Sequence, residues 1–143
     1  MNYSNFSKNV LSWYNLNKRD LPWRYKGNSK KDPYKIWVSE IMLQQTTVTA
    51  VMPYYNKFIK RWTNIKKLSS TNIEDVLDFW SGLGYYRRAR NLHLTAGIIN
   101  KEFNGVFPNK EVLDNEFKTM FLSFVSEEDF TIFKTIKHKI KYN

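Results

Sequence analysis

Glu40 is the one carboxylate in a stretch, residues 34–44, that is apolar on nearly every side. In a helix it would share a face with Ile36 and Leu43, four and three residues away. Apolar surroundings disfavour the charged form of a carboxyl group, and a general acid at neutral pH needs the protonated form. The alternative is a glutamate at the edge of the helix, either solvated or paired with Lys35. This setting makes Glu40 a candidate proton donor.

The net charge of +10 is typical of a protein with a polyanionic partner, most often nucleic acid. Residues 1–108 contain 17 Lys and Arg against 7 Asp and Glu, so the whole positive excess lies there. Residues 109–143 contain 6 of each sign. Chance in a short sequence is the alternative explanation of this division. If it is not chance, the surface that meets the polyanion is built from residues 1–108.

The composition excludes several classes of protein. With no cysteine, the chain forms no disulfide and supplies no thiolate to zinc or to an iron–sulfur cluster, and we predict no metal site. A content of 42% hydrophobic and 17% aromatic residues predicts a folded core rather than a disordered tail. No apolar run approaches the ~20 residues that span a bilayer, and the first residues lack a secretory signal. We therefore expect a cytoplasmic protein without a membrane partner.

The elements that position these residues are predicted to be helices. Apolar residues recur three and four positions apart through most of the chain, and no stretch alternates with the period of a strand. Asp32 followed by Pro33 is a helix start, and Thr71-Asn72 opens another. The expected fold class is all-α, with helices near residues 4–17, 34–44, 47–61, 73–80 and 86–103.

Three motifs resemble, in order, those of the MutY-type adenine DNA glycosylases of the helix-hairpin-helix base-excision superfamily. They are Arg-Asp-Leu-Pro-Trp-Arg at 19–24, Ser-Glu-Ile-Met-Leu-Gln-Gln-Thr at 39–46, and Gly-Leu-Gly-Tyr-Tyr-Arg-Arg-Ala-Arg-Asn-Leu-His at 82–93. The likeness runs from about Phe6 to Pro108. It implies part of the family's helical domain, and a DNA glycosylase that hydrolyses the N-glycosidic bond of adenine mispaired with 8-oxoguanine or guanine. Its partner would be double-stranded DNA with a mismatched adenine.

The resemblance also assigns roles around the adenine. Glu40 would be the catalytic acid that protonates the adenine ring. Trp23 and Leu43 would wall the pocket, with Arg19 and Arg24 near enough for polar contact. A stacked aromatic ring and a guanidinium are suitable partners for a purine.

A second group of residues is implied to face the DNA. An apolar or aromatic wedge can offset the stacking lost when a base leaves the duplex. The arginines would contact phosphates, although a solvated helix face is the alternative, and the Gly-Leu-Gly segment could be a plain interhelical turn. The implied DNA-binding residues are Gln45, Thr46, Leu83, Gly84, Tyr85, Arg88 and Arg90.

The match stops after Pro108. The family would continue with a glycine hairpin that binds the DNA backbone, an aspartate that stabilises the sugar cation, and four cysteines that hold a [4Fe-4S] cluster. Residues 109–143 contain neither glycine nor cysteine. We therefore divide the chain into residues 1–108, the front of a glycosylase domain, and a divergent tail, 109–143. The chain alone is expected to be inactive unless a second polypeptide supplies the missing half. A non-catalytic DNA-binding fragment and an inactive remnant are the alternatives.

Overall fold

The computed structural model describes residues 3–24 and 31–108, with side chains described from residue 5 onward. All regular structure in these two ranges is α-helical, which confirms the all-α prediction. Residues 109–143 lie outside the described residues, so the division of the chain at residue 109 stays a prediction. The six helices are α1 (Tyr3–Asn17), α2 (Pro33–Leu43), α3 (Val48–Arg61), α4 (Ile65–Ser69), α5 (Ile73–Trp80) and α6 (Arg87–Glu102).

Five of these helices agree with the predicted ranges to within about two residues, and the capping residues explain why. The Asp32 side chain accepts from the Tyr34 amide at the start of α2, and Asn72 accepts from the Glu74 amide at the start of α5. Helix α4 was not predicted, because five residues are too few to show a helical period. It is held by its own cap, Asn64, whose side chain accepts from the Lys67 amide.

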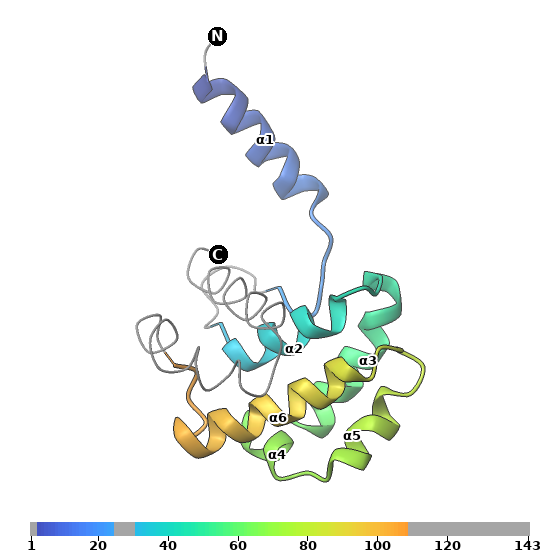
Figure 1. Ribbon diagram of the computed structural model, residues 1–143. Coiled ribbons are helices and arrows are strands. Elements are labelled where there is room, and N and C mark those ends of the chain that lie inside the picture. The colour runs from blue at the N-terminus through green and yellow to red at the C-terminus, as the bar shows by residue number, and fades with distance from the viewer. Residues whose placement is uncertain (1–2, 25–30, 109–143) are drawn as a thin grey trace.

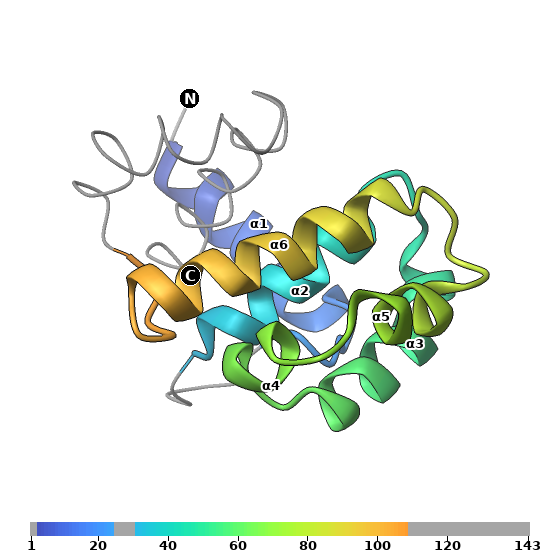
Figure 2. The ribbon, with the colours of Figure 1, turned by 60° about the horizontal axis from the view of Figure 1, so that its bottom comes forward.

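Helices α2 to α6 form one packed body around a single core. Helix α6 packs against α4, α5 and α2, and α2 also packs against α3; Figures 1 and 2 show α6 crossing the other helices. The inner face of α6 carries Leu92, Ala96 and Ile99, each at most 1% exposed. The largest fully buried rings are Trp37 and Trp80. The predicted apolar spacing of α6 is therefore the spacing of its buried face.

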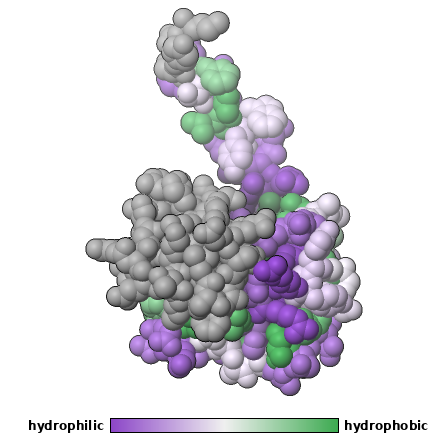
Figure 3. All heavy atoms as spheres, viewed as in Figure 1, coloured by the Kyte–Doolittle hydropathy of each residue, from purple (hydrophilic) through white to green (hydrophobic). Residues whose placement is uncertain are grey.

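Helix α1 lies apart from this body in Figure 1, joined to it by an extended segment. The helix predicted near residues 4–17 does form, but its apolar residues Phe6, Val10 and Trp13 are 71%, 46% and 65% exposed. The hydrophobic colouring along α1 in Figure 3 shows the same exposure. Leu16, near the end of the helix, is 86% exposed. None of the described helices is long and apolar enough to cross a membrane.

Candidate active site and nucleic-acid interface

Helix α2 positions Glu40 in its last turn. Proline at the first helical position and the Asp32 cap fix where the helix begins, and hence which residues turn inward. Trp37, Val38 and Met42 face the core, whereas Glu40 is partly buried on the side between core and solvent. A carboxyl group in that position combines an apolar flank with access from outside.

The segment before α2 brings Trp23 against the body. The Arg24 amide donates to the Leu21 carbonyl at 2.9 Å, and this turn sends Trp23 inward while leaving Arg24 exposed. The Trp23 ring meets Tyr55 of α3 edge to face, with centroids 5.1 Å apart, and is only 8% exposed. Tyr55 in turn donates to the Lys35 carbonyl of α2 at 3.2 Å. Trp23 is thus connected to the helix that carries Glu40.

The arginines of this segment point outward. Both Arg19 and Arg24 are exposed, and an Arg24 Nη donates to the Arg19 carbonyl at 3.5 Å. Leu43 is partly buried at the end of α2. A pocket walled by Trp23 and Leu43, with these arginines at its rim, stays a prediction.

A tight turn joins α2 to α3, directly after the last helical turn of α2, which carries Glu40. Thr46 Oγ1 donates to the Gln44 carbonyl at 3.2 Å, and Thr47 caps α3 by accepting from the Ala50 amide at 3.3 Å. Gln45 lies between Gln44 and Thr46 at φ 54°, a left-handed conformation that an L-residue adopts only at some cost. That conformation leaves the Gln45 side chain exposed.

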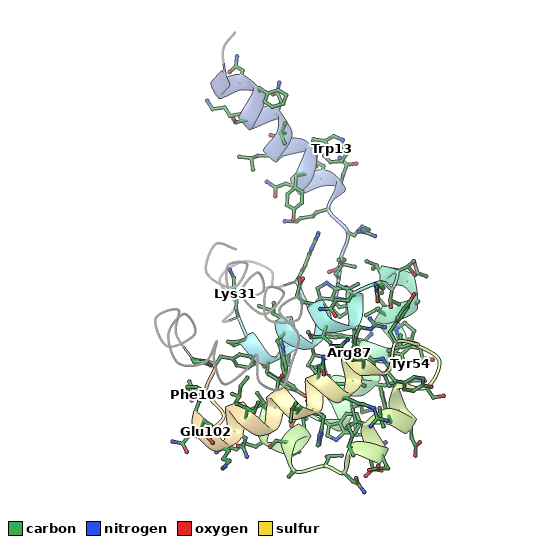
Figure 4. The ribbon with its side chains drawn as sticks, viewed as in Figure 1. Trp13, Lys31, Tyr54, Arg87, Glu102 and Phe103 are labelled. Carbon is green, nitrogen blue, oxygen red and sulfur yellow. The ribbon has the colours of Figure 1, made fainter. Side chains whose placement is uncertain are left out.

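The loop between α5 and α6 has a similar form. Gly82, Gly84 and Tyr85 all have positive φ, at 95°, 69° and 49°. Tyr85 is 59% exposed. Tyr54 of α3 donates to the Ser81 carbonyl at 3.0 Å and closes the start of the loop. In Figure 4, Tyr54 and Arg87 lie at the end of the body where α6 begins, away from Glu102 and Phe103 at its other end.

Leu83 corrects one sequence-based expectation. It was implied to enter the duplex, but it is 6% exposed and belongs to the hydrophobic core cluster. Its amide also donates to the Trp80 carbonyl at 3.0 Å. A side chain held inside the core offers no wedge, whereas Tyr85 and Tyr86 of this loop are 59% and 43% exposed. Contact between Tyr85 and DNA stays a prediction.

Arg88 corrects a second one. It was implied to contact phosphate, with a solvated face as the alternative, but it is 6% exposed. Nη1 donates to the carbonyls of Ile41 at 3.2 Å, Met42 at 2.9 Å and Gln44. Nη2 donates to Thr46 Oγ1 at 3.1 Å and to the Leu83 and Gly84 carbonyls at 3.3 Å each. A guanidinium turned onto these oxygens does not face a phosphate.

The sequence held a signal for this inward position. Arg88 precedes Leu92 by four residues, and Leu92 precedes Ala96 by four, so Arg88 extends the buried stripe of α6 by one turn. Its neighbours Arg87 and Arg90 lie off that stripe and are exposed. Arg90 therefore keeps its expected place on the outer surface, and sequence reasoning missed the difference within the triplet.

Comparison with known proteins decides the family. The family model described as "HhH-GPD superfamily base excision DNA repair protein" matches residues 38–139, from α2 to beyond Pro108. This chain belongs to the HhH-GPD superfamily. The resemblance that its motifs carry is thereby confirmed at the level of the family.

Within the superfamily, the chain is similar to proteins named adenine DNA glycosylase. The chain is 53% identical over 105 residues to the adenine DNA glycosylase of Buchnera aphidicola subsp. Baizongia pistaciae (strain Bp), covering 73% of this chain and 29% of the relative. It is 45% identical over 107 residues to the adenine DNA glycosylase of Mus musculus, covering 72% of this chain and 21% of the relative. The chain thus spans less than a third of the length of these relatives.

A solved structure agrees on the fold. The structure of a thermostable thymine-DNA glycosylase superposes with a TM-score of 0.66 at 27% identity, over 76% of this chain and 49% of that one. The chain thus has the fold of a thymine-DNA glycosylase, while its similar relatives by sequence are named adenine DNA glycosylases. The fold alone does not select the base, and the choice of base must come from site residues.

The iron–sulfur cluster that the family resemblance implies does not fit this chain. Such a cluster is held by cysteine thiolates, and the chain contains no cysteine. The described residues also contain no group of three or more His, Cys, Asp or Glu side chains that could hold a metal ion.

Proposed function

We propose that this HhH-GPD chain acts in base-excision repair as the adenine-binding part of an adenine DNA glycosylase. Its substrate is double-stranded DNA with adenine mispaired with 8-oxoguanine or guanine. One arrangement carries the proposal: Glu40 occupies the last turn of α2, Gln45 follows it on an exposed turn, and Arg88 ties that turn to the Tyr85 loop. Relatives named adenine DNA glycosylase, 53% and 45% identical, support the choice of adenine.

The first step is extrusion of the adenine. A base stacked in a duplex is out of reach of any active site, so it must leave the helix before its bond is cut. Tyr85, 59% exposed, can stack in the space that the adenine leaves. Gln45, exposed beside it in the proposed interface, can hydrogen-bond to base edges. Exposed Arg87 and Arg90 attract the phosphate backbone.

The second step is cleavage of the bond between adenine and the sugar. Glu40 donates its proton to the adenine ring, and the bonding electron pair leaves with the base as the sugar becomes cation-like. A water oxygen then bonds to the anomeric carbon and releases one proton to the solvent.

A second carboxylate stabilises the sugar cation in reactions of this type, and we assign that role to no residue of this chain. We therefore propose that adenine release needs a second polypeptide that carries this carboxylate and the DNA-binding hairpin. Repair of this kind suits the cytoplasmic location that the composition predicts.

A salt-dependent binding assay, coupled to an assay of adenine release, tests the proposal. We expect the chain to bind an A:8-oxoguanine duplex more tightly than an A:T duplex, with an affinity that falls as salt rises. We expect no adenine release from the chain alone. Equal affinity for both duplexes would contradict adenine recognition. Adenine release by the chain alone would contradict the need for a second polypeptide, and release that also persisted in Glu40→Gln would contradict the role of Glu40.

The second candidate function is non-catalytic DNA binding, which the net charge of +10 and the exposed arginines of α6 favour. The same assays separate the two. A general DNA-binding fragment would show the salt dependence without a preference for the mispaired adenine.

A further inference from the structure

Arg88 contacts both segments of the proposed interface. The first segment is the turn Gln44–Thr46 after α2, and the second is the loop Leu83–Tyr85 before α6. Arg88 Nη1 donates to carbonyls at the end of α2 and in the turn, and Nη2 donates to Thr46 in the turn and to a carbonyl of the loop. The two segments are about forty residues apart in sequence, and one guanidinium binds both.

The contacts to Tyr85 and Trp80 extend this connection. The Arg88 guanidinium carbon lies 5.5 Å from the centroid of the Tyr85 ring and 5.6 Å from that of Trp80, within the range of a cation–π contact. The Arg88 amide donates to the Tyr85 carbonyl at 3.0 Å, and Trp80 Nε1 donates to the Gly84 carbonyl at 3.1 Å. The exposed Tyr85 ring is therefore held in place by contacts with the buried Arg88 side chain.

The electrostatics explain why a buried charge is tolerated here. All six acceptors are neutral oxygens, and five are main-chain carbonyls. The Ile41 and Met42 carbonyls belong to the C-terminal turn of α2, the negative end of its dipole, where a cation is favourable. Burial lowers the pKa of the Arg88 guanidinium, while Tyr85 acts in the opposite direction. An arginine still stays charged at neutral pH.

Resting on the proposed function, we propose that Arg88 is a positioning residue that locks the Gln44–Thr46 turn and the Leu83–Tyr85 loop into one unit, so that Gln45 and Tyr85 meet the duplex together. Arg88 itself does not touch the DNA. Gln45 and Tyr85 both have left-handed backbone conformations. Such conformations are costly and persist only where surrounding contacts hold them. Arg88 contacts Tyr85 directly, and it bonds Gln44 and Thr46, the two neighbours of Gln45.

The first test is amide hydrogen exchange of the free chain, which needs no DNA. Lysine keeps the charge but lacks the planar fork that spans both segments. We expect Arg88→Lys to raise exchange at least fivefold in residues 44–46 and 83–86, with α3 and α4 unchanged. Arg87→Lys, on the exposed neighbour, is the matched control and leaves both segments unchanged. Exchange unaltered in either segment of Arg88→Lys would overturn the proposal.

A milder variant covers the case in which Arg88→Lys fails to fold. Thr46→Val removes one acceptor of Nη2 on the side of the turn only. If Arg88 couples the segments, exchange rises in residues 83–86 as well as at the mutated turn. A rise confined to residues 44–47 would overturn the coupling.

Duplex binding then separates positioning from a merely structural role. At a temperature where circular dichroism shows the variant folded, we expect Arg88→Lys to bind the A:8-oxoguanine duplex about tenfold more weakly than wild type. Adding Tyr85→Ala in that background should cost less than it costs in wild type, because Tyr85 is already displaced. Unchanged affinity, or fully additive losses, would overturn the proposal. Failure of the wild type to bind any duplex would defeat the proposed function, while the exchange experiment still decides the role of Arg88.

Discussion

Helices α1 and α6 are nearly equal in length, 15 and 16 residues, and both follow from the same kind of apolar spacing. Their side chains have opposite surroundings. On α6 the apolar stripe is covered by α2, α4 and α5, whereas on α1 Phe6, Trp13 and Leu16 are 65–86% exposed. Spacing therefore predicts that a helix forms and which face is apolar, but it does not predict what covers that face.

The same substitution made in both helices should have very different effects on stability. Leu92→Ala, at a site 1% exposed, should destabilise the chain by about 2–5 kcal/mol, because it removes buried methyl groups and leaves a cavity. Leu16→Ala, at a site 86% exposed, should stay within about 0.5 kcal/mol of wild type. Urea unfolding followed by circular dichroism measures both. Similar losses at the two sites would show that α1 is covered in solution.

A pair of glycine substitutions gives the next largest effect. Gly82→Ala should cost about 1–3 kcal/mol, because φ is 95° and the new Cβ would collide with the Tyr54 hydroxyl. Gly97→Ala, in α6 with nothing within 4 Å of the new Cβ, should stabilise by about 0.5–1 kcal/mol. Thermal unfolding of the two variants checks the opposite signs. Two losses of the same size would contradict the open space described at Gly97.

Tyr34→Phe tests a buried hydrogen bond of the body. Tyr34 is 4% exposed and donates to the Trp62 carbonyl at 2.7 Å, so its removal leaves a buried acceptor unpaired and should cost about 1–2 kcal/mol. Burial, with Asp32 and Tyr55 nearby, raises the pKa of the Tyr34 phenol. The unfolded chain therefore ionises first, and stability should fall as pH rises above about 10. Tyr34→Phe should lose less stability over that pH range than wild type.

The smallest effect concerns an exposed ion pair of the body. Arg61 and Asp75 lie 3.3 Å apart with side chains half exposed, and Asp75 is in the first turn of α5. Asp75→Asn should cost about 0.3–1 kcal/mol at low salt and less at high salt. Asp78→Asn, in the last turn of the same helix, is the control and should be neutral or slightly stabilising. A loss that does not shrink with salt would contradict the assignment to electrostatics.

The parts of the fold that the sequence predicts are those with local causes. Asp32 with Pro33, and Asn72 with Glu74, set helix starts within a few residues of chain, and both caps form. Helix α4 was not predicted, because five residues are too few to show a helical period of apolar residues. The burial of Leu83 and Arg88 was not predicted, because the family resemblance implied that both residues contact DNA. Each instead depends on contacts with distant segments, such as the Arg88 bonds to α2.

In the candidate site, too, the features with local causes could be predicted from the sequence, and those that depend on long-range contacts could not. Local sequence placed Glu40 on α2 and Gln45 just beyond it, and the structure keeps them there. That the Gln44–Thr46 turn and the Tyr85 loop lie together depends on a long-range network through Arg88, which motifs alone do not reveal. The similar relatives are named adenine DNA glycosylases, and the pocket that Trp23 and Leu43 are predicted to wall stays a prediction.

Duplex binding by two tyrosine variants tests whether DNA binds at the end of the body where α6 begins. Tyr85 on the proposed interface and Tyr14 on α1 are both exposed, at 59% and 42%. We expect Tyr85→Ala to bind an A:8-oxoguanine duplex about tenfold more weakly, the value of one lost stacking contact, and Tyr14→Ala to change the affinity less than twofold. Equal losses, or a larger loss at Tyr14, would contradict the placement of the DNA at the end of the body where α6 begins.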